Sequence, residues 1–174
     1  PTQRDDIAPA DFLDYRERST SFSAIAAVIP YSYDYSGGGT PEALFGAQVT
    51  EGFWDAIGMQ PRIGRGFVPD EHKAGGRKVI VIPQGLWQSR FGGDPNILQR
   101  NLRLNGQVLT VIGVMPPDFG FPKGAEYWVP LAFNRFQLQG SARFFLVTAL
   151  LKLNITVAQA QSDLNAIAEQ AARD

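Results

Sequence analysis

The sequence predicts an α+β protein, in which helices and strands both contribute to apolar cores. Apolar residues make up 44% of the 174 residues and charged residues 19%, a balance typical of folded domains. Stretches with a helical period alternate along the chain with stretches of strand period. The dipeptide Asn105-Gly106 separates two alternating β-branched flanks, which predicts a tight hairpin turn.

The chain is expected to begin with a helix at Ile7–Arg18. Pro9 suits the first turn of this helix, because a missing backbone N–H costs nothing there. After a break at Ser19–Ser21, Phe22, Ile25 and Ala26 are expected to continue its apolar stripe.

A hairpin and a short helix are expected next. Val28–Tyr35 and Glu42–Val49 alternate in polarity and flank a glycine turn at residues 37–39, as two paired strands would. Thr50 is a suitable N-cap for a helix that ends at Gly58. The glycine-rich and charged stretch Pro61–Gly76 is expected to be a loop and a boundary between lobes.

The middle block follows that loop and contains the clearest turn and cap signals. Its expected elements are a buried strand at Val79–Ile82, a helix at Gln84–Phe91 stopped by Gly92-Gly93, a helical turn opened by Asp94-Pro95, a hairpin with strands Leu102–Leu104 and Gln107–Met115, and a strand at Trp128–Leu131.

The C-terminal block returns through the polar stretch Asn134–Arg143 to a strand at Phe144–Leu151. Thr156 and Gln159 then match a capping box, in which each side chain satisfies a free backbone N–H of the other residue. The helix that follows is expected to bury one apolar face, made of Val157, Ala160, Leu164, Ile167 and Ala171.

Composition excludes several classes of function. The chain has 16 Lys and Arg against 17 Asp and Glu, without a basic cluster, so it lacks the footprint of a nucleic-acid binder. It has no cysteine, which removes disulfides, thiolate metal sites and cysteine nucleophiles. No run approaches the roughly 20 apolar residues of a membrane span. No signal peptide is visible, and targeting and membrane segments are expected to lie outside this chain.

No residue stands out as catalytic, cofactor-binding or metal-ligating. His72 is the only histidine. It lies beside Asp70 and Glu71 and is expected to be a solvated loop residue, since a metal site or a serine triad needs convergent partners that the sequence does not offer. The stretch Gly64-Arg65-Gly66 is half a dinucleotide fingerprint, and turn geometry explains it better. We therefore expect a non-enzyme without cofactors.

The aromatic residues leave two interpretations open. Tyr31, Tyr33 and Tyr35 fall on one side of a strand and suit a face that stacks on sugars or peptides. Tyrosine is also an ordinary strand residue, and this second interpretation is favoured. Trp87 and Phe91, one helical turn apart, are expected to pack in a core.

A set of short motifs, each weak alone, follows in a fixed order over nearly the whole chain. They are Pro9-Ala10-Asp11-Phe12-Leu13-Asp14, Val49-x-x-Gly52-Phe53-Trp54, Gly64-Arg65-x-Phe67, Gly85-Leu86-Trp87, Arg90-Phe91-Gly92-Gly93-Asp94-Pro95, Leu102-x-Leu104-Asn105-Gly106, Val111-x-Gly113-Val114-Met115-Pro116-Pro117 and Ala158-Gln159-Ala160. The ordered set resembles the MacB-type periplasmic core domain of ABC transporter permeases, especially the family abundant in acidobacteria. Pro83, Gln99 and Asn154 depart from the family pattern at turns and caps.

The resemblance implies a two-lobe α+β domain. A porter-like lobe would comprise residues 1–72 and 135–174, and a Sabre-like lobe would be inserted at residues 73–134. The domain would lie on the periplasmic face of the bacterial inner membrane, as part of an integral membrane protein. Its implied partners are the permease's own transmembrane helices, an ATPase, a second permease copy and often a periplasmic adaptor. The implied function is transmission of ATP-driven motion to export a substrate, without catalysis in this domain.

Two alternatives from other classes remain at the level of sequence. The first is a free-standing carbohydrate- or peptide-binding domain that uses the tyrosine face. The second, much weaker, is a hydrolase built around His72.

Overall fold

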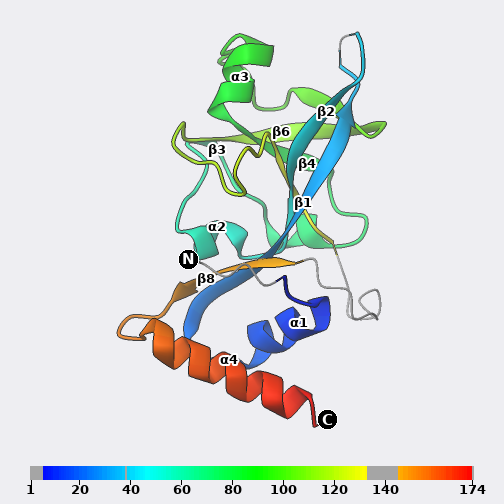
Figure 1. The fold of residues 1–174 in the computed structure, drawn as a ribbon. Helices are drawn as coiled ribbons and strands as arrows, with labels where there is room; N and C mark the ends of the chain where they lie inside the picture. The colour runs from blue at the N-terminus through cyan, green and yellow to red at the C-terminus, as the bar shows by residue number, and fades with distance from the viewer. Residues whose placement is uncertain (1–5, 38, 133–144, 174) are drawn as a thin grey trace. The chain divides into compact units, whose positions relative to one another are not determined.

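The computed structural model describes residues 6–37, 39–132 and 145–173 and confirms the α+β class. Two compact units divide these residues (Figure 1). The first unit contains the chain up to Ile29, Gly52–Met59 and the residues from Phe145 onward. The second unit contains Pro30–Glu51 and Gln60–Ala132.

The first unit is built from both ends of the described chain. Its elements are α1 (Pro9–Arg18), the first part of β1 (Phe22–Tyr35), α2 (Phe53–Ile57), β8 (Leu146–Leu151) and α4 (Val157–Ala171). β1 and β8 run antiparallel, with Phe22 opposite Leu151 and Val28 opposite Leu146. α1 packs against α4, and α2 packs against β8.

The predicted continuation of the helical stripe through Phe22, Ile25 and Ala26 is wrong, because these residues belong to β1. The α1 helix ends at Arg18, and the next residue, Ser19, has an extended backbone with φ −70° and ψ 136°. Residues beyond this point pair with β8, about 120 positions away in sequence. A partner so distant overrides the local helical spacing.

The predicted N-caps Thr50 and Thr156 have opposite outcomes. The capping box before α4 is confirmed: the Gln159 amide donates to Thr156 Oγ1 at 3.2 Å, and the Thr156 amide donates to Gln159 Oε1 at 2.8 Å. The Thr50 cap is wrong, since α2 begins after Gly52, which has φ 87° and makes no side-chain cap. The end of α2 at Gly58 is as predicted, with φ 67°.

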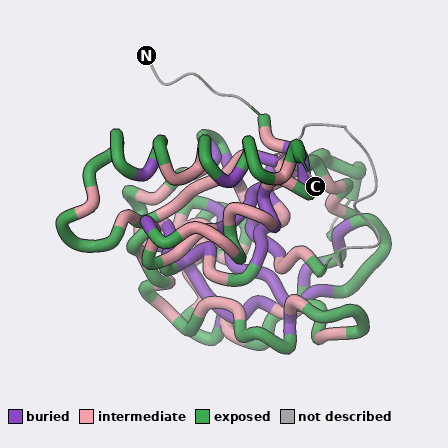
Figure 2. Tube along the Cα trace, turned by 90° about the horizontal axis from the view of Figure 1, so that it is seen from below, coloured by how far each residue is buried: buried purple, intermediate pink, exposed green. Residues whose placement is uncertain are grey.

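Only part of the predicted apolar face of α4 is buried. Ala160 and Ile167 are buried, while Leu164 and Ala171 are half-buried. Val157 is 74% exposed, so its inclusion in that face is wrong. Figure 2 shows the resulting pattern, in which the helix that ends at the C-terminus is mostly exposed, with short intermediate and buried stretches.

The second unit is a mixed sheet whose strand order closes on itself. Its elements are the remainder of β1, β2 (Glu42–Val49), β3 (Ile63–Gly64), the 3-10 helix η1 (Pro69–His72), β4 (Val79–Pro83), α3 (Gln84–Phe91), β5 (Asn101–Leu104), β6 (Gln107–Met115) and β7 (Trp128–Pro130). The order β2-β7-β4-β6-β5-β1 returns to β2 through a β1–β2 pairing. The β2–β7 and β4–β6 pairs are parallel. Such closure removes open edges and encloses a core.

This core consists of apolar side chains from the strands, from α3 and from the connections that hold Ile97 and Tyr127. It contains Leu44, Ile80, Ile82, Leu86, Ile97, Leu102, Leu104, Leu109, Val111, Val114, Tyr127 and Val129. Trp87 and Phe91 pack against it, as the sequence predicts. The Trp87 indole N–H also donates to the Asp94 carbonyl at 2.9 Å.

The hairpin prediction is confirmed, and the neighbouring helical turn is not. Asn105 and Gly106 have φ values of 47° and 73°, as a type I′ turn requires, and Leu104 lies opposite Gln107. Asp94 opens a turn rather than a helix. Its carboxylate accepts a hydrogen bond from the Asn96 amide at 2.8 Å, as the predicted N-cap would. The Ile97 amide donates to the Asp94 carbonyl at 3.1 Å, which closes a single turn that does not continue into a helix.

The two compact units do not share the predicted lobe boundaries. Pro30–Glu51 and Gln60–His72 belong to the second unit, because β2 pairs with β7 and β3 pairs with β6. The predicted loop Pro61–Gly76 contains β3 and η1. The predicted link Asn134–Arg143, and Phe144 at the start of the predicted last strand, lie outside the described residues. The division at residues 72 and 134 into porter-like and Sabre-like lobes stays a prediction.

Candidate functional site

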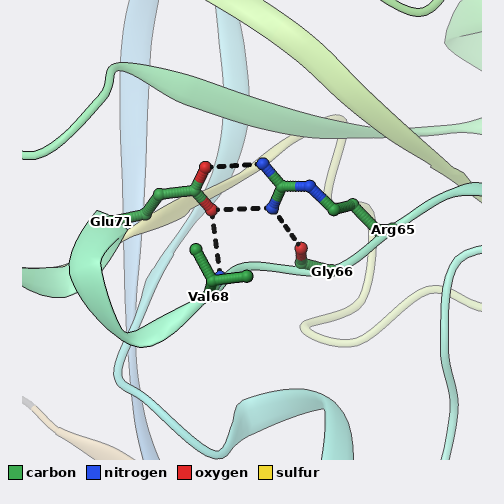
Figure 3. Close-up of polar contacts among 4 residues, drawn as sticks. All are labelled: Arg65, Gly66, Val68 and Glu71. Atoms are coloured by element: carbon green, nitrogen blue, oxygen red, sulfur yellow. Dashed lines mark hydrogen bonds and ion pairs between the residues drawn. The ribbon is translucent and has the colours of Figure 1, made fainter.

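A polar cluster in the second unit joins Arg65 to Glu71 (Figure 3). The Arg65 guanidinium binds both carboxylate oxygens of Glu71, with Nη2–Oε1 at 2.8 Å and Nη1–Oε2 at 3.0 Å. Nη1 also donates to the Gly66 carbonyl at 2.9 Å, and the Val68 amide donates to Glu71 Oε2 at 3.0 Å. This bidentate arrangement fixes the chain between β3 and η1 in one conformation.

The backbone around Arg65 has the close approach that only glycine permits. Gly64 has φ 73°, and a Cβ atom there would lie 2.0 Å from the Ile112 carbonyl oxygen. Its partner in the β3–β6 ladder is Gly113, where a Cβ atom would lie 2.6 Å from the Arg65 carbonyl oxygen. The two glycines let β3 lie against β6, which directs Arg65 toward η1.

Glu71 is charged although its side chain is only 3% exposed. Burial by itself raises the pKa of a carboxyl group. Here the hydrogen bonds from Arg65 and from the Val68 amide, together with the charges of Arg65 and Arg77, outweigh burial and lower the pKa of Glu71. Glu71 is therefore a structural anion that holds η1 in place.

His72 does not lie in solvent as predicted. It is half-buried, and its ring meets Phe67 edge to face, with centroids 5.8 Å apart and planes at 82°. Within the part of the chain that the structure describes, its buried Nδ1 atom has no hydrogen-bond partner. Burial lowers the pKa of His72, against smaller opposing effects of the Leu131 backbone, Glu51 and Glu71. Packing against Phe67 overrides the polar sequence context on which the prediction rested.

The structure brings no metal cluster together among residues 6–37, 39–132 and 145–173: no three histidine or carboxylate side chains there are close enough to hold an ion. Gly64 lies in β3 and does not open a helix. Its positive φ serves a close approach to Ile112 within the sheet, where the sequence predicted turn geometry.

The three tyrosines of β1 mainly make packing contacts within the second unit. Tyr33 stacks on Tyr127 with centroids 5.1 Å apart and planes at 5°. Tyr31 meets the edge of Tyr33 at 5.1 Å and is 47% exposed. Tyr35 packs against the core and lies under the Arg90 guanidinium, 4.8 Å from its ring centroid. Because two of the three rings are occupied by the protein's own residues, a large open stacking face does not form.

Hydrogen bonds lock the same tyrosines further. The Tyr127 hydroxyl donates to the Tyr31 carbonyl at 2.6 Å, and Gln48 Nε2 donates to the Tyr33 hydroxyl at 2.7 Å. A Cβ atom at Gly46 would lie 2.5 Å from the Tyr127 ring, so this glycine makes room for the tyrosine. The sequence signals strands here, but it does not signal that Tyr127 inserts beside Tyr33.

A polar cluster in the first unit was also missed by sequence reasoning. Asp163 of α4 accepts hydrogen bonds from the hydroxyls of Ser19 and Ser21, both at 2.7 Å, and from the amides of Thr20 and Ser21. The serine hydroxyls are the main reason why the pKa of Asp163 is lowered. The sequence of residues 19–21 signals only that the first helix ends there. In the structure, the Asp163 carboxylate accepts hydrogen bonds from the side chains and backbone amides of these residues.

Comparison with known proteins gives this chain a family. The sequence model of the MacB-like periplasmic core domain matches residues 2–167. A search of curated proteins found no match. In the described part of the chain, no helix is both long enough and apolar enough to cross a membrane.

Solved structures with the same fold come from transporters. The periplasmic region of MacB from Actinobacillus actinomycetemcomitans aligns with a TM-score of 0.72 and 15% identity, over 96% of this chain and 75% of that one. The extracellular domain of the noncanonic ABC-type transporter YknZ from Gram-positive bacteria aligns with a TM-score of 0.67 and 16% identity, over 96% and 85%. The TM-scores show a shared fold and, at these identities, the fold alone. The match over residues 2–167 shows that the chain belongs to the MacB-like periplasmic core domain family.

Proposed function

We propose that this chain is the extracytoplasmic domain of an ABC transporter permease and that it transmits ATP-driven motion in order to export a substrate. The family match over residues 2–167 carries the proposal. The likeness in fold to the MacB periplasmic region and to the YknZ extracellular domain supports it.

The proposal has several parts beyond membership of the family. The domain is attached to the permease's own transmembrane helices and lies on the periplasmic face of the inner membrane. A cytoplasmic ATPase drives it, a second permease copy completes a dimer, and an adaptor binds it from the periplasm. Residues 1–72 and 135–174 would form the porter-like lobe, and residues 73–134 the inserted Sabre-like lobe.

The division of the chain into two compact units favours a mechanical function. Each unit has its own rigidifying contacts, the Arg65–Glu71 pair in the second and the Asp163 cluster in the first. Rigid bodies of this kind transmit a displacement without deforming, because packed cores resist compression.

Distance measurements in the intact permease with its ATPase test this motion. The chain contains no cysteine, so Val108→Cys and Val157→Cys introduce unique labelling sites within it, in the second and first units. Both positions are exposed, Val108 at 46% and Val157 at 74%. Double electron–electron resonance should show a distance distribution that differs between the ATP-trapped and nucleotide-free states.

The matched control places both labels in the second unit, at Val108 and Lys123, and its distance should not respond to nucleotide. An ATPase-inactive variant should abolish the response of the first pair. An unchanged Val108–Val157 distribution in a permease with full ATPase activity would refute the transmission of motion. Export is tested separately, by comparing the tolerance of cells to a panel of toxic compounds with the active and the inactive ATPase.

A further inference from the structure

A pocket of about 210 Å³ opens in the second unit, where the 73–78 loop meets the ends of several strands. Its apolar floor belongs to the core: Val79, Leu104, Leu109 and Val129 line it and are at most 6% exposed. A pocket of this size exceeds the roughly 150 Å³ cavity that holds a benzene ring. It therefore has room for one small ring or a short alkyl chain with a polar head group.

The rim of the pocket carries more positive than negative charge. Lys73, Arg77 and Lys78 line it, and all three are exposed. The one carboxylate in the lining is Glu71, whose two oxygens are already bound by Arg65 and by the Val68 amide. Its negative charge is thus largely compensated within the protein, which leaves the rim attractive to an anion.

The cations of the rim differ in whether they form an ion pair within the protein. Lys73 forms an ion pair with Asp70 at 2.5 Å. Over the described ranges, neither Arg77 nor Lys78 has an ion-pair partner within 4.0 Å, although the charge of Arg77 helps to lower the pKa of Glu71. These two side chains are free to bind a carboxylate or phosphate that approaches the mouth of the pocket.

Tyr33 adds a donor on the wall of the pocket. Its hydroxyl accepts a hydrogen bond from Gln48, so the phenolic proton is not used in that bond. Stacking on Tyr127 holds the ring in place and leaves little freedom for it to turn away. A fixed donor beside an apolar floor and a cationic rim is a combination that orients an amphipathic ligand.

We propose that this pocket binds a small amphipathic organic anion, with its apolar body on the core floor and its negative head group at Arg77 and Lys78. This goes beyond the transport role and does not depend on it. The pocket volume limits the ligand to roughly ten non-hydrogen atoms.

The proposal is tested by titrating the chain with phenylacetate and following amide resonances in ¹⁵N-labelled protein. The amides of Gly75, Gly76 and Asn105 lie in the pocket lining and should shift in a saturable manner. Neutral phenylacetamide, which has the same shape, should bind about ten-fold more weakly because it lacks the charge. Acetate, which has the head group alone, should also bind more weakly because it leaves the apolar floor empty.

Variants locate the binding site. The double variant Arg77→Gln/Lys78→Gln should weaken phenylacetate binding by about ten-fold. The matched control, Arg103→Gln/Lys123→Gln, removes two exposed cations of the same unit that do not line the pocket, and should change affinity by less than about two-fold. Ala74→Trp, at the exposed mouth, should block binding. Thermal melting confirms that each variant is folded.

Three outcomes would overturn the proposal. Equal binding of phenylacetate and phenylacetamide would show that the charge plays no part. Equal losses in the two double variants would show a general attraction of anions to the surface rather than a site. Absence of saturable shifts at Gly75, Gly76 and Asn105 would show that the pocket does not take this class of ligand. None of these outcomes bears on the nucleotide-dependent distances in the permease.

Discussion

The two units hold themselves together in different ways. The second unit encloses a continuous apolar cluster within a strand order that closes on itself, and residues such as Ile80 and Ile82 are fully buried there. The first unit packs three helices and a short strand pair around fewer buried apolar residues, with Phe12 and Phe145 edge to face at 5.7 Å. It adds the polar Asp163 cluster, which ties α4 to the end of α1. The second unit is therefore stabilised mainly by a core between strands. The first unit is stabilised by packing of helices on a strand pair, together with the hydrogen bonds of the Asp163 cluster.

The largest expected difference between the units comes from matched core truncations. Ile82→Ala in β4 removes a fully buried side chain and should cost about 4 kcal/mol of unfolding free energy. Ile167→Ala in α4 starts from 6% exposure on a helix at the surface and should cost about 2 kcal/mol. Urea unfolding followed by fluorescence and by circular dichroism measures both. Equal costs would mean that the two cores are packed equally well.

The next largest effect is expected where β3 lies against β6. Gly64→Ala forces a Cβ atom to within 2.0 Å of the Ile112 carbonyl oxygen and strains a φ of 73°, so it should cost about 3 kcal/mol. The control is Gly85→Ala in α3, where a Cβ atom meets nothing within 4 Å and should stabilise the helix by about 0.5 kcal/mol. If Gly64→Ala melts like the wild type, the close approach at this glycine is not needed.

These residues also show how far the sequence predicts the structure. Asn105-Gly106 and the Thr156–Gln159 box were predictable because each is a local device whose geometry depends on residues within four positions. The first half of β1 was not predictable, because its state is decided by pairing with β8. The family resemblance was visible from the ordered motifs, although the sequence did not say what each motif residue does.

The polar clusters escaped prediction for a related reason. Gly64-Arg65-x-Phe67 looks like loop sequence, and its meaning appears only when β3 pairs with β6 and directs Arg65 to Glu71. His72 looks solvated beside two acids, and only the packing of Phe67 shows that it is half-buried. Long-range contacts assign roles to residues whose local context is uninformative.

A moderate loss of unfolding free energy should distinguish Asp163 and its hydrogen bonds from an ordinary surface charge. Asp163→Ala removes the acceptor of four hydrogen bonds from Ser19–Ser21, of which Ser21 is buried, and should cost about 1–2 kcal/mol. Glu169→Ala on the same helix removes only an exposed ion pair with Arg173 and should cost less than about 0.5 kcal/mol. Chemical denaturation of both variants gives the comparison, and equal small losses would show that the cluster does not stabilise the unit.

The smallest effects are expected from acid, and in the second unit they should include the titration of His72 and Glu71. The folded chain lowers the pKa of His72 and that of Glu71, so in both cases the unfolded chain binds the proton more tightly. The stability that each group contributes is complete above its unfolded pKa and is lost as the pH falls toward its folded value. For His72 this loss begins near its ordinary pKa of 6.5, and for Glu71 near 4.5.

His72→Gln should therefore flatten the dependence of unfolding free energy on pH just below 6.5 and leave the lower range unchanged. Glu71→Gln should lower stability at neutral pH and flatten the range below 4.5. Urea denaturation across this pH range measures both slopes, and an unaltered slope below 6.5 in His72→Gln would mean that another group titrates there.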